Sequence, residues 1–424
     1  MVSASAPLVS ASTSCPTGLR RRPTLLSAVL GTALLASLST LTACEGGDPS
    51  GGATCDAANF CEEIDGVAQC QEGYEWEDEA NLICAFGGVP LLGSNGHTLD
   101  DVVFEEVANR DDGLREPRDI AFHPTRTDEL WTLNFTDSST TVFLGIDRGE
   151  PAAIKYNAFG NTHFMAHPAA LAFSDTGIWA SAQEEDDLTQ GPVEFGGTPA
   201  DFMGPSLWPD DLNLFDSGHA SHLDMMHNSP NAVGIAWETG NAYWIYDGYH
   251  RSLSRYDFAE DHGPGGSYHG DGSVLRYVES EVSYEPGVTS SMVFEHDTSL
   301  LFLADSAENC IKVLDTTTGT VGASYGPNYD GGDQNHVNEA ELMVLIDGDD
   351  IDGMERPSGL EFHGDYMFVT DNATGRIFAF TKNGELLDYL DTEIEGLQGM
   401  AFDDDGRMYI VHPSGDRIVR IGEL

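Results

Sequence analysis

A short motif that recurs six times within residues 100–424 constrains the fold more than any other feature of this chain. Each copy combines small residues, often a proline near its start, with apolar side chains, and ends in an aromatic ring. The copies lie at residues 116–122, 168–173, 232–237, 290–294, 357–362 and 397–402. Repetition of this kind indicates one structural unit stacked on itself. We therefore expect a single large repeat domain.

Further β-prone stretches follow the copies, separated by turns rich in glycine and aspartate. Second strands are expected at residues 129–133, 242–246, 300–305, 366–371 and 408–411, and third strands at 254–257, 311–315, 376–380 and 417–421. This order of strands and turns is typical of a propeller blade. The arrangement resembles the NHL-repeat family, which implies an all-β, six-bladed β-propeller (NHL/YWTD-like). Such a fold implies no particular activity.

Blade six requires a strand from elsewhere, because the chain ends after its third strand. The β-prone stretch Val102–Val107 precedes blade one, and we expect it to supply the missing outer strand and close the ring. Long inserts at residues 184–228 and 322–353 make the spacing of the blades uneven. Either insert could instead hold a further blade.

The N-terminal 43 residues have the pattern of a secretory signal peptide. Three arginines, Arg20–Arg22, precede an apolar run from Leu25 to Leu41. The ending Leu41-Thr-Ala-Cys44 resembles a bacterial lipobox, which implies lipidation of Cys44 and a tether over residues 44–54. An uncleaved transmembrane helix is the alternative. We expect a protein of the bacterial cell envelope, anchored in the membrane through Cys44 and facing the periplasm or the cell exterior.

Four cysteines crowd into the segment 55–85, which predicts a small disulfide-rich module. Four cysteines allow three pairings. The run Cys70–Tyr74, followed by Cys84, resembles the C-terminal half of an EGF-like module, although Ala68 stands where such a module has another cysteine. The resemblance implies the disulfides Cys70–Cys84 and Cys55–Cys61.

The charge balance excludes one class of partner. The chain has 71 acidic and 19 basic residues, a formal net charge of −52. Such a surface repels the phosphate backbone, so we expect no nucleic acid partner. The acidic loops at residues 330–333 and 347–353 suit calcium, but a solvated acidic turn is the more economical interpretation.

Eight of the fourteen histidines fall between residues 163 and 269. Imidazole and carboxylate groups are common ligands of zinc, and His222 and His227 bracket Asp224 at the expected start of blade three. A second group, residues 262–271, is expected to form a structured turn on the opposite face. A purely structural role for the loop histidines is the alternative. Our candidate metal ligands, for zinc or calcium, are His167, His222, His227 and His250.

Around the channel mouth, the topology should gather polar side chains from every blade. Besides the candidate ligands, the expected set comprises Glu116, Arg118, His163, His219, Asp224, Asp247, Tyr249, Asp305, Glu355, Arg356, Asp371 and His412.

Residues 241–252 contain the run Asp247-Gly248-Tyr249. This run resembles a segment of the peptidyl-hydroxyglycine lyases, zinc-dependent NHL propellers, which implies a catalytic Tyr249. A tyrosine that only packs between blades is the alternative. The positions that match the zinc histidines of that family hold Ala169, Ser290 and Gln398. Residues 243–247 are also similar to the repeats of low-density-lipoprotein-receptor propellers.

Two functions are therefore open. The first is a lipid-anchored module that binds an extracellular or periplasmic ligand or protein, or acts as a scaffold. The second is a metal-dependent lyase or hydrolase with its site at the channel mouth. Convergence of several imidazoles within ligand distance of one metal would favour the enzyme.

Overall fold

The computed structural model describes residues 61–64, 67–70, 74–78, 83–146, 152–157, 164–188, 202–215 and 221–424. Residues 90–424 belong to one compact unit, and the described residues before them belong to another. The predicted signal peptide 1–43, the lipidation site Cys44, the tether and Cys55 lie outside the described residues. No helix in the described ranges is long and apolar enough to span a bilayer.

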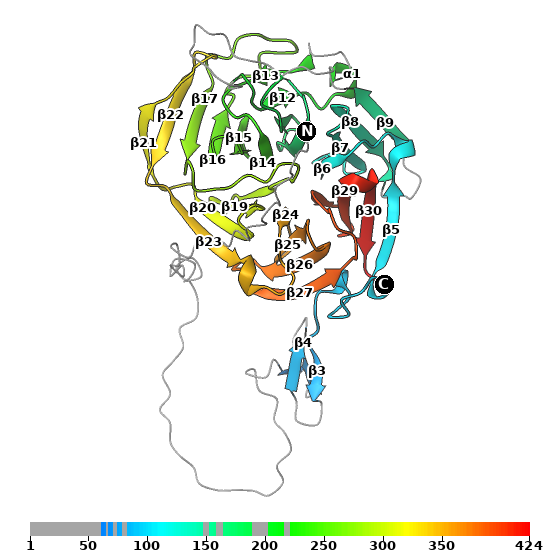
Figure 1. The fold of residues 1–424 in the computed structure, drawn as a ribbon. Coiled ribbons are helices and arrows are strands. Elements are labelled where there is room, and N and C mark those ends of the chain that lie inside the picture. The colour runs from blue at the N-terminus through cyan, green and yellow to red at the C-terminus, as the bar shows by residue number, and fades with distance from the viewer. Residues whose placement is uncertain are drawn as a thin grey trace, which may run out of the picture. The chain divides into compact units, whose positions relative to one another are not determined.

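Six sheets, each containing four antiparallel strands, surround a central axis in the larger unit, which confirms the six-bladed propeller (Figure 1). From the inside outward, the strands are β6 (Pro117–Phe122), β7 (Glu129–Asn134), β8 (Ser139–Leu144) and β9 (Ala152–Asn157) in blade one; β10 (Pro168–Phe173), β11 (Trp179–Gln183), β12 (Ser206–Trp208) and β13 (Asp224–Met225) in blade two; β14 (Ala232–Thr239), β15 (Ala242–Asp247), β16 (Ser252–Asp257) and β17 (Ser273–Tyr277) in blade three; β18 (Met292–Glu295), β19 (Leu300–Asp305), β20 (Cys310–Asp315) and β23 (Glu341–Asp347) in blade four; β24 (Pro357–His363), β25 (Tyr366–Asp371), β26 (Arg376–Thr381) and β27 (Leu386–Asp391) in blade five; and β28 (Met400–Phe402), β29 (Met408–His412), β30 (Arg417–Gly422) and β5 (Val103–Ala108) in blade six.

The recurring motif forms the inner strand of every blade, and its small residues let the blades approach one another at the axis. The Ser290 N–H donates to the Val233 carbonyl at 2.9 Å, which joins blades three and four. A Cβ at Gly234 would lie 2.0 Å from the Ser290 carbonyl oxygen, and one at Gly359 would lie 2.4 Å from that of Gln398. Only glycine fits at such distances.

The core lies between neighbouring blades rather than at the axis. The second strands β7, β11 and β15 are buried along their whole length. Between blades one and two, aromatic rings fill the gap, with the Trp131 and Trp179 centroids 5.6 Å apart. Because a sheet in this position must be covered on both faces, its strands are nearly continuous apolar runs.

The predicted closing strand is confirmed. β5 pairs antiparallel with β30, so the first described strand of the propeller completes the last blade (Figure 1). Ion pairs between Arg420 and Glu105, and between Arg417 and Glu106, reinforce the ladder. Closure covers the edge that blade six would otherwise leave open.

Within the described residues, neither insert holds a further blade. The first supplies β12, the short helix α1 (Leu212–Phe215) and β13 to blade two. The second adds β21 (Thr320–Ser324) and β22 (Asp333–Asn338) to the outside of blade three, where β22 pairs in parallel with β17. It then continues into β23, the fourth strand of blade four.

The smaller unit contains two hairpins. β1 (Cys61–Ile64) pairs with β2 (Val67–Cys70), and β3 (Tyr74–Asp78) pairs with β4 (Ile83–Phe86). The predicted disulfide Cys70–Cys84 is confirmed. Cys61 is also disulfide-bonded, while its predicted partner Cys55 lies outside the described residues.

Two truncations test the importance of ring closure. A chain that starts at residue 98 keeps β5, whereas one that starts at residue 110 exposes the fully buried Ile418 and Ile421 beside it. We expect the shorter chain to lose about 5 kcal/mol or more of unfolding free energy, or to fail to fold. Urea denaturation of both chains measures the difference. Equal stability of the two would contradict the closing role of β5.

Candidate functional site

The segment that leads into blade four crosses the channel mouth at Gly287. The Gly287 carbonyl accepts hydrogen bonds from the Arg118 guanidinium of blade one and, at 2.9 Å, from the Gln398 amide of blade six. Its N–H donates to Glu184, next to blade two, at 2.6 Å. The Thr289 hydroxyl donates to Gln398 Oε1 at 2.7 Å. Because three other blades contact this segment, it acts as a plug across the axis.

Buried charges hold the plug in place. Arg118 is 4% exposed, stacks over the Phe135 ring at 4.2 Å and lies 3.9 Å from Glu184 Oε2. Tyr284 donates from its hydroxyl to the other oxygen of Glu184 at 2.8 Å. Burial, together with the Glu184 charge, raises the pKa of Tyr284 far above its usual value. The phenol therefore remains a neutral donor, and the network stays intact at physiological pH.

Outside the plug, a pocket of about 500 Å³ opens at the mouth. Its charged groups neutralise one another: Arg110 pairs with Asp416 at 2.6 Å, and the Glu116 carboxylate accepts from Thr136 at 2.6 Å and from Arg118 at 2.7 Å. The lining residues are Arg110, Glu116, Thr136, Gly287, Asn372, Gly396, Gln398, Pro413, Ser414 and Asp416. Most of its charge is therefore already compensated within the protein.

A serine and a histidine form a hydrogen-bonded pair beside this pocket. Ser414 Oγ lies 2.9 Å from His412 Nε2, and Arg417 Nε donates to His412 Nδ1 at 2.9 Å. Burial and the Arg417 charge lower the pKa of His412. Since Arg417 cannot accept a proton, we assign the neutral ring its hydrogen on Nε2, where the Ser414 hydroxyl and the Glu395 carbonyl are acceptors. His412 therefore donates to Ser414 and cannot act as its general base, unlike the histidine of a hydrolytic triad.

An unusual backbone conformation positions the side chains just before the inner strands. Glu116, His167 and Asn231 directly precede β6, β10 and β14, and their φ angles are 53°, 47° and 51°. A non-glycine residue in this region is uncommon and marks a constrained position. The chain turns sharply there before it enters each of these blades.

Two of the predicted metal ligands are engaged with neighbouring carboxylates. His167 Nδ1 lies 2.7 Å from Glu185 and its ring stacks on Phe135, while His250 Nδ1 lies 2.7 Å from Asp247. Although burial opposes ionisation, hydrogen bonds from the Asp187 N–H and His167 hold the pKa of Glu185 below its usual value.

Tyr249, the predicted catalytic residue, is 38% exposed, and its ring meets that of His250 edge to face. Its phenol therefore lies at the surface, outside the lining of the mouth pocket.

The other two predicted ligands lie at the outer rim rather than at the start of blade three. His222 and His227 flank β13, the outermost strand of blade two. They line a separate pocket of about 310 Å³ together with Phe164, Phe202, Met225, Gly265, Gly266, Ser267, His269, Tyr329 and Asp330. His222 and His227 lie at the rim because the first insert supplies the third and fourth strands of blade two, and both residues flank the fourth.

The turn 262–271 joins this rim pocket, which corrects the expectation that it lies apart from His222 and His227. His222 Nε2 lies 3.1 Å from the Gly266 carbonyl, and His269 Nδ1 is hydrogen-bonded to Asp224. The ring centroids of His227 and His269 are 6.5 Å apart. This turn connects the third and fourth strands of blade three and packs against the edge of blade two, a contact that strand order alone does not indicate.

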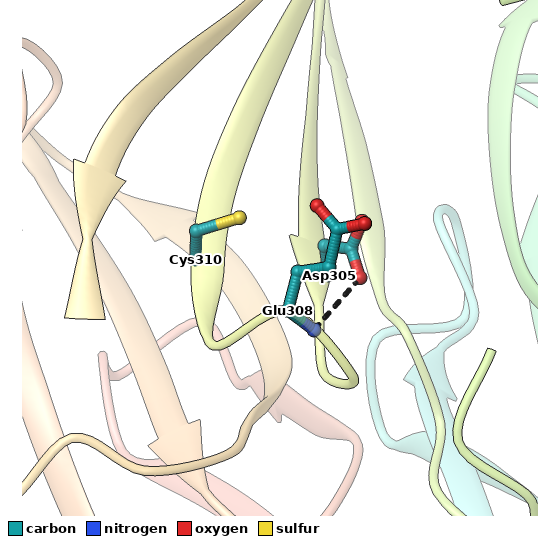
Figure 2. A group of neighbouring side chains, drawn as sticks. All are labelled: Asp305, Glu308 and Cys310. Atoms are coloured by element: carbon teal, nitrogen blue, oxygen red, sulfur yellow. Dashed lines mark hydrogen bonds between the residues drawn. The ribbon is translucent and has the colours of Figure 1, made fainter. Parts of the chain in front are cut away.

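Among the described residues, the one group of three ligand atoms mutually within 4.8 Å is Asp305, Glu308 and Cys310, so the four predicted histidines do not form such a group. Figure 2 shows the two carboxylates together near the turn between β19 and β20, with Cys310 at the start of β20. An ammonium already occupies this position. Lys312 Nζ lies 2.8 Å from each carboxylate and 2.8 Å from the Glu281 carbonyl oxygen.

Although burial favours the neutral amine, Asp305 holds the pKa of Lys312 above its usual value. The side chains of Lys312 and Asp305 are both fully buried. Lys312 and Asp305 therefore form a buried ion pair, with Glu308 as a third partner. A metal could bind the two carboxylates only by displacing the Lys312 ammonium group.

Replacement of Lys312 tests this interpretation. Lys312→Met leaves Asp305 and Glu308 without their cation, and we expect a loss of about 3–5 kcal/mol in urea denaturation. Lys382→Met is the matched control, because Lys382 is 37% exposed and pairs with Glu295 at the surface, where about 1 kcal/mol or less is expected. A Lys312→Met protein as stable as the wild type would refute the ion-pair role.

The acidic loops of the sequence have structural partners. Asp330 accepts at 2.5 Å from His227, and Asp347 caps the short helix Gly348–Asp350 by accepting from the Asp349 N–H. These contacts agree with structured turns.

Comparison with known proteins shows the fold of this chain but not its family or its activity. No protein-family model matches the chain, and no curated protein matches it either. An auxiliary nutrient binding protein from Bacteroides ovatus has 12% identity and a TM-score of 0.50 over 85% of this chain and 88% of its own.

Virginiamycin B lyase from Staphylococcus aureus has 11% identity and a TM-score of 0.44, over 76% of this chain and 100% of its own. The calcium-binding protein regucalcin from Agrobacterium tumefaciens has 11% identity and a TM-score of 0.45, over 76% and 94%. At such identities the likeness concerns the architecture alone.

Sequence reasoning missed the plug and the inverted serine–histidine pair. The pair had a local signal, since His412-Pro413-Ser414 follows directly on the second strand of blade six, where turns face the mouth. From the sequence, Gln398 was notable only because it stands where the lyases have a zinc-binding histidine. In the structure its amide donates to the Gly287 carbonyl. The plug had no local signal, because its partners are far apart in the sequence.

Proposed function

We propose that this protein is a lipid-anchored, extracytoplasmic binding module that holds a small neutral polar ligand, such as a glycan unit, in the mouth pocket. The observation that carries the proposal is the orientation of the Ser414–His412 pair. Because the imidazole donates to the serine, the hydroxyl proton of Ser414 is available to a ligand rather than abstracted by a base. The pocket thus offers a hydrogen-bond donor and no activated nucleophile.

The charge pattern supports a neutral ligand. Arg110, Glu116 and Asp416 are paired within the protein, so a charged ligand would have to break an ion pair in order to be compensated. The Asn372 amide and the Ser414 hydroxyl are uncharged polar groups in the same lining. Hydroxyl-rich ligands match such groups with little desolvation of charge. The plug beneath the pocket gives it a rigid floor.

A panel of neutral mono- and oligosaccharides, measured by thermal shift and calorimetry on the form lacking residues 1–44, tests the proposal. We expect at least one to stabilise the protein, with about tenfold weaker binding in Ser414→Ala and in Asn372→Ala, since each loses one hydrogen bond. Glu385→Gln, an exposed position in blade five, is the control and should bind normally. Unchanged affinity in both pocket variants, or no binding across the panel, would reject the site.

A fluorophosphonate probe tests the orientation of the pair. We expect no labelling of Ser414 at pH 7–8, because its imidazole partner presents a proton to it rather than a lone pair. Labelling that disappears in Ser414→Ala would instead indicate a nucleophilic serine and a hydrolase.

The second candidate, the metal-dependent lyase or hydrolase, would use the rim pocket, although its described side chains do not form a group of three ligand atoms within 4.8 Å of one another. His227 and His269 each hydrogen-bond a carboxylate through Nδ1, which is how metal-binding imidazoles are commonly oriented. A ligand set dominated by imidazole favours zinc over calcium. Tyr249 is not part of this pocket lining, so an enzyme here would need another acid or base.

Metal content separates the two candidates. If the rim pocket is a zinc site, mass spectrometry of the purified protein should find near-stoichiometric zinc that is lost in His222→Ala and His227→Ala. His250→Ala should retain it, because His250 lies outside that lining. A folded, metal-free protein would exclude the enzyme in this form and leave the binding proposal standing.

A further inference from the structure

A second cavity occupies the other end of the channel, beyond the plug. It has a volume of about 310 Å³, and all six blades contribute to it through residues of their inner strands or directly beside them. Inner strands of a propeller run in the same direction along the axis. The mouth pocket is built from residues that precede inner strands, such as Glu116, or follow second strands, such as Ser414, whereas Phe122 and Phe173 line the present cavity from the far ends of their inner strands. The two cavities therefore lie at opposite ends of the channel.

Most of the side chains that line this cavity are apolar, while polar atoms, including main-chain groups, supply about half of its exposed wall. The apolar side chains are those of Ile120, Ala121, Phe122, Pro124, Ala170, Leu171, Ala172, Phe173, Ile235, Ala236, Trp237, Met292, Val293, Phe294, Leu360 and Met400, with Ser291 as an uncharged polar member of the lining. The rings of Phe122, Phe173, Trp237 and Phe294 are half-buried, so solvent reaches this end. A pocket of about 300 Å³ or more that is lined mainly by apolar side chains is typical of small-molecule sites.

Two acidic side chains line the same cavity. Asp119 is 9% exposed and accepts hydrogen bonds from the Ile120 and Leu171 N–H groups at 3.0 and 2.9 Å. Glu361 accepts one from the Phe362 N–H at 2.9 Å. In the described part of the chain, no lysine, arginine or histidine forms an ion pair with either carboxyl group. Asp305, by contrast, is buried with Lys312 at 2.8 Å.

Burial raises the pKa of Glu361 to about 7. It also raises the pKa of Asp119 to about 7, with a further contribution from the Glu361 charge. The cavity therefore gains negative charge between pH 6 and 8 and holds no cation of its own to balance it. A ligand that supplied one positive charge would compensate it.

We propose that this cavity is a binding site for a small organic monocation, such as a protonated primary amine on an aromatic or alkyl body. The Glu361 carboxylate pairs with the ammonium group, and the aromatic rings near the opening receive the apolar body and contribute cation–π attraction. An inorganic cation fits poorly, because calcium takes about six to eight oxygen ligands and the lining side chains offer only the carboxyl groups of Asp119 and Glu361 and the Ser291 hydroxyl. The inference is independent of the mouth pocket and of the proposed function.

Binding should depend on pH with a defined sign. Only an ionised carboxylate attracts the ammonium ion, and a group with a pKa of about 7 is about tenfold more ionised at pH 8 than at pH 6. Affinity should therefore rise about tenfold over that range. Near pH 7, binding should release a fraction of a proton from the two carboxyl groups. The buffer takes up this proton, so the measured heat of binding should depend on the buffer.

Benzylammonium is the probe, and benzyl alcohol is its neutral control of similar shape. Isothermal titration on the form lacking residues 1–44 is performed at pH 6 and 8, and at pH 7 in phosphate and HEPES, neither of which is a primary ammonium ion. We expect benzylammonium to bind, about tenfold more tightly at pH 8, with buffer-dependent heat. Glu361→Gln should lose at least tenfold in affinity at pH 8 and should show a weaker pH dependence, because only Asp119 then titrates in the cavity. Trp237→Leu should weaken binding several-fold and keep the pH dependence.

Folding of the key variant can be checked in the same preparations. A buried acid with a raised pKa is protonated in the folded state at pH 5, and stability falls as pH rises from about 4 to about 7. Glu361→Gln removes this loss, so its Tm should exceed that of the wild type by more at pH 8 than at pH 5. Glu385→Gln removes the same charge at an exposed position and should not show that difference.

Three results would overturn the proposal. The first is no benzylammonium binding at pH 8, and the second is equal binding of benzyl alcohol, which would make the cavity merely apolar. The third is unchanged affinity in a folded Glu361→Gln protein. None of these results bears on the saccharide panel, which concerns the other end of the channel.

Discussion

The pairing of β5 with β30 is the interaction on which the rest of the structure depends. Each blade buries both of its faces against its neighbours, so an open ring would leave apolar sheet faces and a free edge exposed to water. The strand that closes blade six comes from the segment before blade one. Closure therefore joins the start of the propeller to its end, and only a closed ring has a channel in which residues from all six blades can meet.

The channel is divided by its plug into two cavities of different chemistry. At the mouth, buried and half-buried charges are paired across blades, and what remains for a ligand is a set of uncharged polar groups. At the other end, mainly apolar and aromatic side chains surround two carboxyl groups without a cation. The same ring of inner strands supports both, because its ends are lined by different residues of each strand.

Much of the fold could be predicted because its signals are local. The inner-strand motif, the alternating turns, the closing stretch before blade one and the Cys70–Cys84 pair each depend on residues close together in sequence or on a repeated pattern. The candidate site was harder to predict. His222 and His227 were expected near the start of blade three, yet the first insert places them at the rim, where His227 meets Asp330, 103 residues further along the chain. Arg118 and Gly287, which meet at the plug, are 169 residues apart.

The sequence by itself determined the six repeated inner strands, their order and the strongly acidic character of the protein, because these follow from repetition and composition, whereas the structure showed that neither insert adds a blade within the described residues. Only the tertiary structure decided which buried ionisable groups have a partner of opposite charge or a hydrogen-bond partner. Lys312 makes the Asp305–Glu308 group an ion pair, and Arg417 turns the His412 proton toward Ser414. Asp119 and Glu361 share a cavity whose described lining holds no basic side chain. The physical reason is that the state of a buried ionisable group depends on its neighbours within a few ångströms, and in a propeller those neighbours often come from other blades.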